Sequence, residues 1–374
     1  MKKLIAAAVA AAVIAPASVM ASGPVMYGKI QMSVNYLDNG GHGDNKYNEA
    51  SLNSNHSRFG IKGSEDLGNG MKVGYLIEWG VDMDGDASKA GGGGDGSGLS
   101  ERNRAVTLSG AWGTALAGKW DTPLKSIGRK VDLFPERLGD NRNMNTRAVL
   151  DARTANTVAY VTPNMGGFTS TIAYVFDVNP ENGMDDSDGD AFSINGIYNN
   201  GPLLLAAAYE SISEDAFGQY SSEDQEVWRL AGSYAFGSFK ILSSYTDISD
   251  GFGVHDNDFY IWTLGSSYSF GSNTVKLQFN GRDDGDFSDN FHDSTPVEDR
   301  INDEGAAWGW AIGLDHAMSK RTTVYVEYGA VNNDDDSNAV AWNTMGNGAD
   351  AGLNSSGNKF KDNSGFGVGI IHKF

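Results

Sequence analysis

Apolar and polar residues alternate along most of the chain. In the segment 26–36, the apolar Ile30 and Met32 alternate with the polar Gln31 and Ser33. A period of two places successive side chains on opposite faces of a β-strand. The alternation predicts sixteen strands, at about 26–36, 58–62, 72–79, 102–109, 114–120, 156–162, 168–176, 191–198, 203–210, 227–236, 239–246, 259–270, 273–280, 306–315, 322–329 and 366–374.

The connections between these strands alternate between short and long. The short ones are 110–113, 163–167, 199–202, 237–238, 271–272 and 317–321. The long ones are acidic and cover 38–56, 82–101, 121–155, 177–190, 211–226, 247–258, 281–305 and 330–365. One end of the molecule therefore carries tight turns and the other end carries large loops.

This plan is typical of a sixteen-stranded antiparallel transmembrane β-barrel with short periplasmic turns and long extracellular loops. A closed sheet also satisfies every backbone hydrogen-bonding group in lipid. A soluble β-sandwich would show alternating strands too. The one-sided loop lengths and the N-terminal segment favour the membrane barrel.

The N-terminal segment reads as a secretory signal peptide. Lys2 and Lys3 precede an apolar run over 4–15, and Val19-Met20-Ala21 resembles a cleavage site. A membrane-spanning helix would need about 20 apolar residues, which this run lacks. We expect residues 1–21 to be removed and 22–374 to form a single barrel domain.

Composition narrows the function classes. The 374 residues include no cysteine and carry a formal net charge of −20. An acidic surface repels nucleic acid, so no nucleic-acid partner is expected. Without cysteine there is no thiol nucleophile and no cysteine-ligated metal. No cofactor is predicted.

Several segments resemble one known family. They are Tyr27-Gly28-Lys29, the run from Ser57 to Gly68, Leu108-Ser109-Gly110, Lys119-Trp120-Asp121-Thr122-Pro123, Asn156-Thr157-Val158-Ala159-Tyr160 and the terminal Phe374. Together they are similar to the Gram-negative general porins over the whole mature chain. Two departures stand out, since the family often has Arg at the position of Lys119, and the glycine-rich stretch 91–98 is peculiar to this chain.

The resemblance implies a homotrimer in the outer membrane of a Gram-negative bacterium. It implies that the third long loop, about 121–155, folds into the lumen and narrows it. It also implies that the outer-membrane assembly machinery reads the last strand, through Phe366, Val368, Ile370 and Phe374. The stretch 91–98 makes the usual latch role of the second loop between subunits uncertain.

The predicted constriction combines a basic wall with a charged loop. The basic side is expected to contain Arg58, Lys62, Arg102, Arg104 and Lys119. The constriction loop contributes Arg129, Lys130, Asp132, Glu136, Arg137, Asp140, Arg142 and Arg147. Opposed charges at a narrow point create a field that orients polar solutes. The same arginines could instead hold the loop in place by neutralising its carboxylates.

These features predict passive diffusion of small hydrophilic solutes and ions, with a weak preference for anions. The acidic mouth opposes that preference because it concentrates cations. A substrate-specific porin is the alternative, although Tyr325 and Phe259 are nearly the only aromatic residues at inward positions. A barrel enzyme or an adhesin is the less favoured alternative. The histidines show no spacing with a serine and an acid that suggests catalysis, so we expect no enzyme.

The acidic loops resemble calcium loops in composition. Asp82–Asp86 and Asp185–Asp190 lack the glutamate at the twelfth position of an EF-hand. No defined metal site is therefore predicted. These carboxylates, with Asp334–Asp336, could share divalent cations with lipopolysaccharide phosphates.

Overall fold

A computed structural model describes residues 22–38, 48–85, 98–144, 150–178, 189–217, 221–283, 306–333 and 363–374. The strands are β1 (Ser22–Asp38), β2 (Asn48–Ser54), β3 (Arg58–Gly68), β4 (Met71–Val81), β5 (Leu99–Gly110), β6 (Gly113–Asp121), β7 (Arg153–Val161), β8 (Phe168–Val175), β9 (Ala191–Asn200), β10 (Leu203–Ile212), β11 (Gln225–Phe236), β12 (Phe239–Ser249), β13 (Phe259–Phe270), β14 (Asn273–Arg282), β15 (Ala307–Ala317), β16 (Thr322–Asn333) and β17 (Asn363–Lys373). The helical pieces are α1 (Pro123–Gly128), η3 (Asn141–Met144), η4 (Glu214–Ala216) and η5 (Gly251–Gly253).

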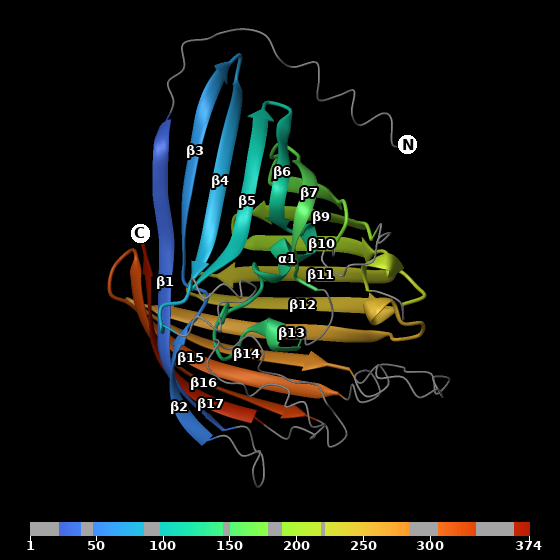
Figure 1. The fold of residues 1–374 in the computed structure, drawn as a ribbon. Coiled ribbons are helices and arrows are strands. Elements are labelled where there is room, and N and C mark those ends of the chain that lie inside the picture. The colour runs from blue at the N-terminus through green and yellow to red at the C-terminus, as the bar shows by residue number, and fades with distance from the viewer. Residues whose placement is uncertain are drawn as a thin grey trace.

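The strands form one closed antiparallel barrel (Figure 1). Each strand from β3 to β17 pairs with the next, and β17 closes the ring by pairing with β1 between Lys29↔Lys373 and Asp38↔Ser364. On its other edge β1 pairs with β2 and then with β3. β2 and β3 therefore lie end to end and together occupy one strand position in the wall. The predicted sixteen-stranded barrel is confirmed.

The second position in the wall differs from the prediction. The first long loop was expected to extend to residue 56, but residues 48–54 form β2. The strand is interrupted only at 55–57, before β3 begins. The break is held by β1, because the Asn55 amide donates to the Gln31 carbonyl at 2.8 Å and the Gln31 amide donates to Ser57 Oγ at 2.9 Å. β2 is too polar to show an alternation of apolar and polar residues, so the hydrophobic pattern does not predict it.

Short and long connections lie at opposite ends of the barrel. The two-residue turns include Asn69-Gly70, Gly237-Ser238 and Gly271-Ser272, and the chain's last strand ends on that side. The long connections follow β1, β4, β6, β8, β10, β12, β14 and β16. In outer-membrane barrels the short turns face the periplasm. The same orientation is expected for this barrel, with its long-loop end outside the cell.

The wall is apolar outside and polar inside. Met26, Val106 and Leu230 are 57–63% exposed, whereas Gln225 and Gln278 are fully buried on the inner face. This reverses the usual arrangement of a soluble protein, because the outer surface meets lipid and the lumen holds water and a folded loop. In the described ranges no helix is long and apolar enough to cross a membrane.

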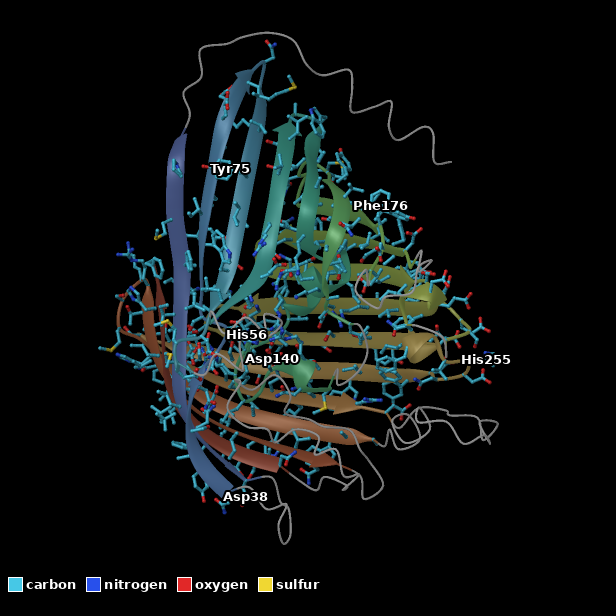
Figure 2. All side chains as sticks on the ribbon, viewed as in Figure 1. Asp38, His56, Tyr75, Asp140, Phe176 and His255 are labelled. Carbon is cyan, nitrogen blue, oxygen red and sulfur yellow. The ribbon has the colours of Figure 1, made fainter. Side chains whose placement is uncertain are left out.

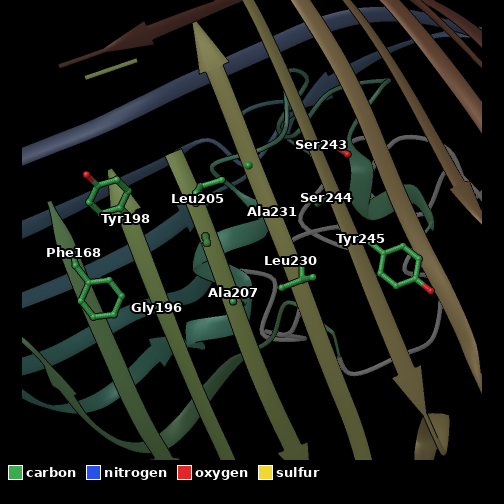
Figure 3. A pocket seen from close by; sticks show the side chains of 12 residues that line it. Phe168, Gly196, Tyr198, Leu205, Ala207, Leu230, Ala231, Ser243, Ser244 and Tyr245 are labelled. Atoms are coloured by element: carbon green, nitrogen blue, oxygen red, sulfur yellow. The ribbon is translucent and has the colours of Figure 1, made fainter. Parts of the chain in front are cut away.

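A shallow hollow on this wall lies outside the lumen (Figure 3). It crosses β8 to β12, and its lining includes the small residues Gly196, Ala207 and Gly232 beside Leu205 and Leu230. Leu205 and Leu230 are more than half exposed on the outer face. Lipid acyl chains meet this surface, so the hollow is no candidate for a solute site.

Gly118 is expected to be essential for the fold of β6. Its φ is +151°, and an added Cβ would lie 2.0 Å from the carbonyl oxygen of Arg104 on β5. Gly118→Ala should therefore strain the β5–β6 pairing by about 2 kcal/mol or more. Heat-modifiable mobility of refolded protein measures the loss of the barrel. Gly23→Ala, where nothing lies within 4 Å, is the control and should fold normally.

Candidate functional site

The segment between β6 and β7 folds into the lumen. Leu124, Ile127, Val131 and Phe134 are wholly buried although they belong to a connection. Helix α1 begins here because Thr122 caps it, its Oγ1 accepting from the Lys125 amide at 3.3 Å, and Pro123 follows at the first helical position. The described parts, 122–144 and 150–152, lie against the inner wall, as the predicted constriction loop requires.

The first part of this constriction loop is fixed to β9 and β11. The Leu124 amide donates to Ser193 Oγ at 3.3 Å, and Asn195 Nδ2 donates to the Pro123 carbonyl at 2.9 Å. Arg229 Nη1 donates to the Leu124 carbonyl at 3.1 Å and pairs with Asp151. Polar side chains of the inner wall therefore satisfy the backbone of the loop.

The middle of the loop is fixed to β14. Lys276 Nζ donates to the Leu133 carbonyl at 2.7 Å, and the Leu133 amide donates to Gln278 Oε1 at 2.8 Å. Gln278 Nε2 also donates to the Gly139 carbonyl at 2.9 Å. Two neighbouring inward positions on one strand thus hold both sides of the loop's bend.

Arg137 clamps the far side of the bend to β15 and β16. Its guanidinium donates two hydrogen bonds to Asp315, at 2.7 and 3.2 Å, and lies 4.0 Å from the centroid of the Tyr325 ring. Glu327 Oε1 accepts from the Leu138 amide at 3.1 Å. Bidentate pairs of this kind fix geometry as well as charge.

Glu136 attaches the loop to the first strands of the barrel, on the other side of the β1–β17 pairing from β15 and β16. Its carboxylate pairs with Lys29 of β1 and, at 2.8 Å, with Arg58 of β3. Gln31 Nε2 donates to the Glu136 carbonyl at 2.9 Å. The two adjacent cations hold the pKa of the Glu136 carboxyl below its usual range, despite its burial. Glu136 therefore stays ionised.

Asp140 organises the inside of the loop. It accepts from the Glu136 amide at 2.6 Å and pairs with Arg129 at 3.1 Å and Arg142 at 2.8 Å. Asp132 is also buried here, 3.5 Å from Arg129. Burial and the neighbouring Asp140 raise the pKa of Asp132 to about 7, and burial, with the nearby Glu136 carboxylate, raises the pKa of Asp140.

Asp132 should make stability depend on pH. Because its pKa is raised above 3.8, the folded protein holds this proton more tightly than the unfolded chain, and the resulting stabilisation is lost as the pH rises from about 4 through about 7. Asp132→Asn should reduce the difference in melting temperature between pH 5 and pH 8. The exposed Asp215→Asn is the control. An unchanged difference in Asp132→Asn would show that another group governs it.

Further cations surround the remaining opening. Arg102 Nε pairs with Glu78 at 2.6 Å, and Asp121 pairs with Arg153 at 3.0 Å and Lys125 at 3.1 Å. The ion pairs that line the constriction or hold its loop involve ten basic and eight acidic side chains. The basic ones are Lys29, Arg58, Arg102, Lys125, Arg129, Arg137, Arg142, Arg153, Arg229 and Lys276, and the acidic ones are Glu78, Asp121, Asp132, Glu136, Asp140, Asp151, Asp315 and Glu327. Lys130 is exposed beside them. The excess of charge is positive.

Arg104 and Lys119 do not belong to the basic wall of the lumen. They are partners in the β5–β6 register, and Arg104 lies opposite the outward-facing Ile77 of β4. The prediction was wrong for both. Leu116, although apolar, turns inward and is 8% exposed, which reverses the inferred parity of β6 and places Lys119 outside. A bulge in β5 lets Arg102 turn inward while Arg104 turns outward.

The other predicted residues have mixed positions. Lys62 is on the inner face of β3, nearer the turns, with Nζ 5.0 Å from the centroid of the Tyr27 ring. Arg147 lies outside the described residues, as do the proposed signal peptide, the stretch 91–97, and most of the acidic segments 185–190 and 334–336. Phe366, Val368 and Ile370 share the exposed outer face of β17.

Sequence reasoning gave His56 no role at the constriction. It lies in the break between β2 and β3 with φ +52°, and its carbonyl accepts from Arg58 Nη1 at 3.2 Å. Figure 2 shows it inside the barrel, in contrast to His255 on an outer loop. Alternation gives no signal for such a break. Among the described residues no group of three His, Asp or Glu side chains is arranged to hold a metal.

A closed barrel with an apolar exterior and a polar lumen narrowed by an inward loop is a channel-forming barrel of the outer membrane. The family model described as Gram-negative porin matches residues 6–336. The chain belongs to this family. It is a porin of the outer membrane, and porins conduct solutes rather than catalyse reactions.

Relatives and solved structures agree with this assignment. Outer membrane porin protein 32 of Delftia acidovorans is 29% identical over the whole chain and 99% of its own length. An outer membrane porin protein of Bordetella pertussis is 29% identical over 67% of this chain and 70% of its own length. The anion-selective porin from Comamonas acidovorans superposes with a TM-score of 0.72 at 25% identity, covering 95% of this chain and all of that one.

Proposed function

We propose that this porin is a passive diffusion channel for small hydrophilic solutes with a weak preference for anions. The observation that carries the proposal is the excess of basic over acidic side chains in the ion pairs of the constriction. The similarity of this chain to the anion-selective porin from Comamonas acidovorans supports the same preference.

Charge at the narrowest point controls selectivity more than charge at the mouth. Arg58 and Arg129 at the constriction are each about a quarter exposed, so a permeating ion can approach both. Charges on the acidic outer loops are screened over a Debye length of about 8–10 Å. The basic constriction should therefore outweigh the chain's net charge of −20.

Single-channel recording in a planar bilayer tests this function. Under a salt gradient, the reversal potential should have the sign expected for anion permeation, and closing should occur in three equal steps. A reversal potential of the opposite sign would contradict the anion preference while leaving the channel intact. Correctly folded protein that gave no conductance would contradict the open pore.

The lumen offers little for a dedicated substrate site. Tyr325 and Phe259 face inward but are 3% and 4% exposed. Arg137 covers Tyr325, and the Arg282 guanidinium lies 4.4 Å from the centroid of the Phe259 ring. Neither ring is available to a passing solute, which supports general diffusion over a substrate-specific porin.

The proposal includes export by removal of residues 1–21, assembly as a homotrimer, and recognition of the last strand by the outer-membrane assembly machinery. The exchange of two backbone hydrogen bonds of 3.1 Å between Phe374 and Gly28 supports a structural need for the terminal residue. Lipopolysaccharide is a further proposed partner, through divalent cations at the acidic loops.

A further inference from the structure

A buried carboxyl group on the inner wall lies beside the start of the constriction loop. Glu210 of β10 is 1% exposed. It lies opposite Ser193 of β9, whose hydroxyl accepts from the Leu124 amide of the loop. The Ser193 and Thr122 hydroxyls are next to Glu210, but within the described ranges neither of its carboxylate oxygens has a partner in hydrogen-bonding geometry. A carboxylate buried in this way is strongly unfavourable unless it takes up a proton or gains a cation.

Arg229 of β11 is a cation within reach of Glu210. In the β10–β11 register Arg229 lies opposite Ala208, two residues from Glu210, so Arg229 and Glu210 are diagonal neighbours on the inner face. Diagonal neighbours in an antiparallel pair lie about 7–8 Å apart, a distance that a long side chain can span. Arg229 pairs with Asp151 of the loop instead.

Arg229 holds both ends of the constriction loop. Its Nη1 donates to the Leu124 carbonyl at 3.1 Å, where the loop begins, and pairs with Asp151, where the loop returns to the wall. The Arg229 and Asp151 side chains are 4% and 5% exposed. A Cβ added at Gly128 would lie 2.8 Å from Arg229 Nη1 and 3.4 Å from Asp151 Oδ1. Helix α1 therefore covers the ion pair, and a single guanidinium fixes two parts of the loop.

Two buried carboxyl groups compete for this guanidinium. The charges that act on Glu210 are those of Asp151 and Arg229, whereas β9 and the start of the loop face it with the uncharged hydroxyls named above. Lys125 of α1 also acts on Asp151, but its ammonium pairs with Asp121 at 3.1 Å. Arg229 can neutralise Asp151 or Glu210, and the protonation state of Glu210 decides between them.

We propose that Arg229 is a proton-controlled anchor of the constriction loop, with Glu210 as its positioning residue. While Glu210 is protonated, Arg229 stays on Asp151 and on the Leu124 carbonyl, and both ends of the loop are fixed. When Glu210 ionises, it draws Arg229 away, and both attachments are lost together. Raising the pH thus loosens the base of the loop, while the bend keeps its contacts to β14, β15 and β16. The anchor regulates the channel proposed above and rests on that function only in the electrical test.

Hydrogen–deuterium exchange of the detergent-purified porin tests the anchor without requiring conductance. The segment 124–131 should exchange faster in wild type than in Glu210→Gln at pH 8, and equally in both at pH 5. Comparing two proteins at one pH cancels the chemical effect of pH on exchange. The ratio of the two rates should rise by at most about tenfold per pH unit, the limit for release of one proton. Because glutamine mimics the protonated carboxyl, a purely structural role predicts no difference that depends on pH.

Asp151→Asn tests the competition from the other side. It removes the carboxylate that competes with Glu210, so wild type should protect 124–131 better than this variant at pH 5 and equally at pH 8. Adding Glu210→Gln to Asp151→Asn should restore part of the protection, since nothing then draws Arg229 from the Leu124 carbonyl. Two structural losses would add instead. Glu226→Gln removes an exposed carboxylate from β11 and is the control, with the exchange of wild type expected.

Two results would overturn the anchor. One is equal exchange of 124–131 in wild type and Glu210→Gln at pH 8. The other is a difference between wild type and Asp151→Asn that is the same at pH 5 and pH 8, and this comparison decides if Glu210→Gln does not fold. Asp132 faces Gln278 of β14 and has a pKa of about 7. The comparison of wild type with Glu210→Gln is therefore repeated in an Asp132→Asn background, where it should keep its sign.

Single-channel recording separates the anchor from the channel function. Wild-type conductance should fluctuate more often at pH 8 than at pH 5, and Glu210→Gln should abolish that increase. A conducting wild type whose exchange does not depend on Glu210 contradicts the anchor and leaves the channel function standing. Folded protein that shows the Glu210-dependent exchange but no conductance contradicts the channel function and leaves the anchor standing.

Discussion

Arg137→Ala should release the constriction loop and raise single-channel conductance. The substitution leaves Asp315 and Glu327 without the cation that pairs with both. Breaking a buried ion pair by removing one partner costs about 3–5 kcal/mol, which is large for one attachment point of a loop. Asp315 keeps Lys276 as a partner at 3.0 Å, so the loss falls mainly on Glu327 and on the attachment of the loop. Conductance in a planar bilayer and the exclusion limit for sugars in liposomes measure the wider opening.

Two variants show whether the bidentate geometry matters. Arg137→Lys keeps the charge but loses the second hydrogen bond to Asp315, so its conductance should lie between wild type and Arg137→Ala. Arg137→Gln/Asp315→Asn removes both charges and should recover part of the closed state. Wild-type conductance in correctly folded Arg137→Ala would mean that β14 and Glu136 hold the loop without the clamp.

Arg58→Gln/Arg102→Gln should shift the reversal potential strongly toward cations. Both arginines line the constriction and both have carboxylate partners, Glu136 and Glu78. Two unit charges about 8 Å apart interact by about 0.5 kcal/mol at the dielectric constant of water, so each lost cation should lower the anion preference about twofold. The double variant should lower it about fourfold, as read from reversal potentials at low salt.

Arg104→Gln/Lys119→Gln is the matched control for this experiment. It also removes two basic residues, but from the outer face of the neighbouring strands β5 and β6. Its reversal potential should equal that of wild type. A shift of equal size in both double variants would mean that the total charge of the barrel end, rather than the constriction, sets selectivity.

The wall could be predicted from the sequence because two solvents impose its pattern. Lipid outside and water inside require alternation, so Leu230 and Arg229 could be assigned to opposite faces without knowing their neighbours. The rule fails where an apolar side chain turns inward. Leu116 is such a residue, and its inward position reverses the assignment of Lys119.

The contacts of the constriction could not be predicted in the same way. Arg137 and Asp315 are 178 residues apart, and no periodicity links a loop position to a particular wall position. The charged residue types in the loop indicated that ion pairs would form, but not their partners. The break at 55–57 is also invisible to alternation, because its hydrogen bonds run to the backbone and side chain of β1.

The bend of the constriction loop spans the place where the two ends of the chain meet. Glu136 is bound to β1 and β3, while the adjacent Arg137 and Leu138 are bound to β15 and β16. Between these groups lies the β1–β17 pairing that closes the barrel. The contacts to β1 and β3 and those to β15 and β16 can hold the bend together only after β1 has paired with β17. Completion of the narrow passage is thus a late event in assembly, and a barrel caught before closure would be a wide, unselective opening.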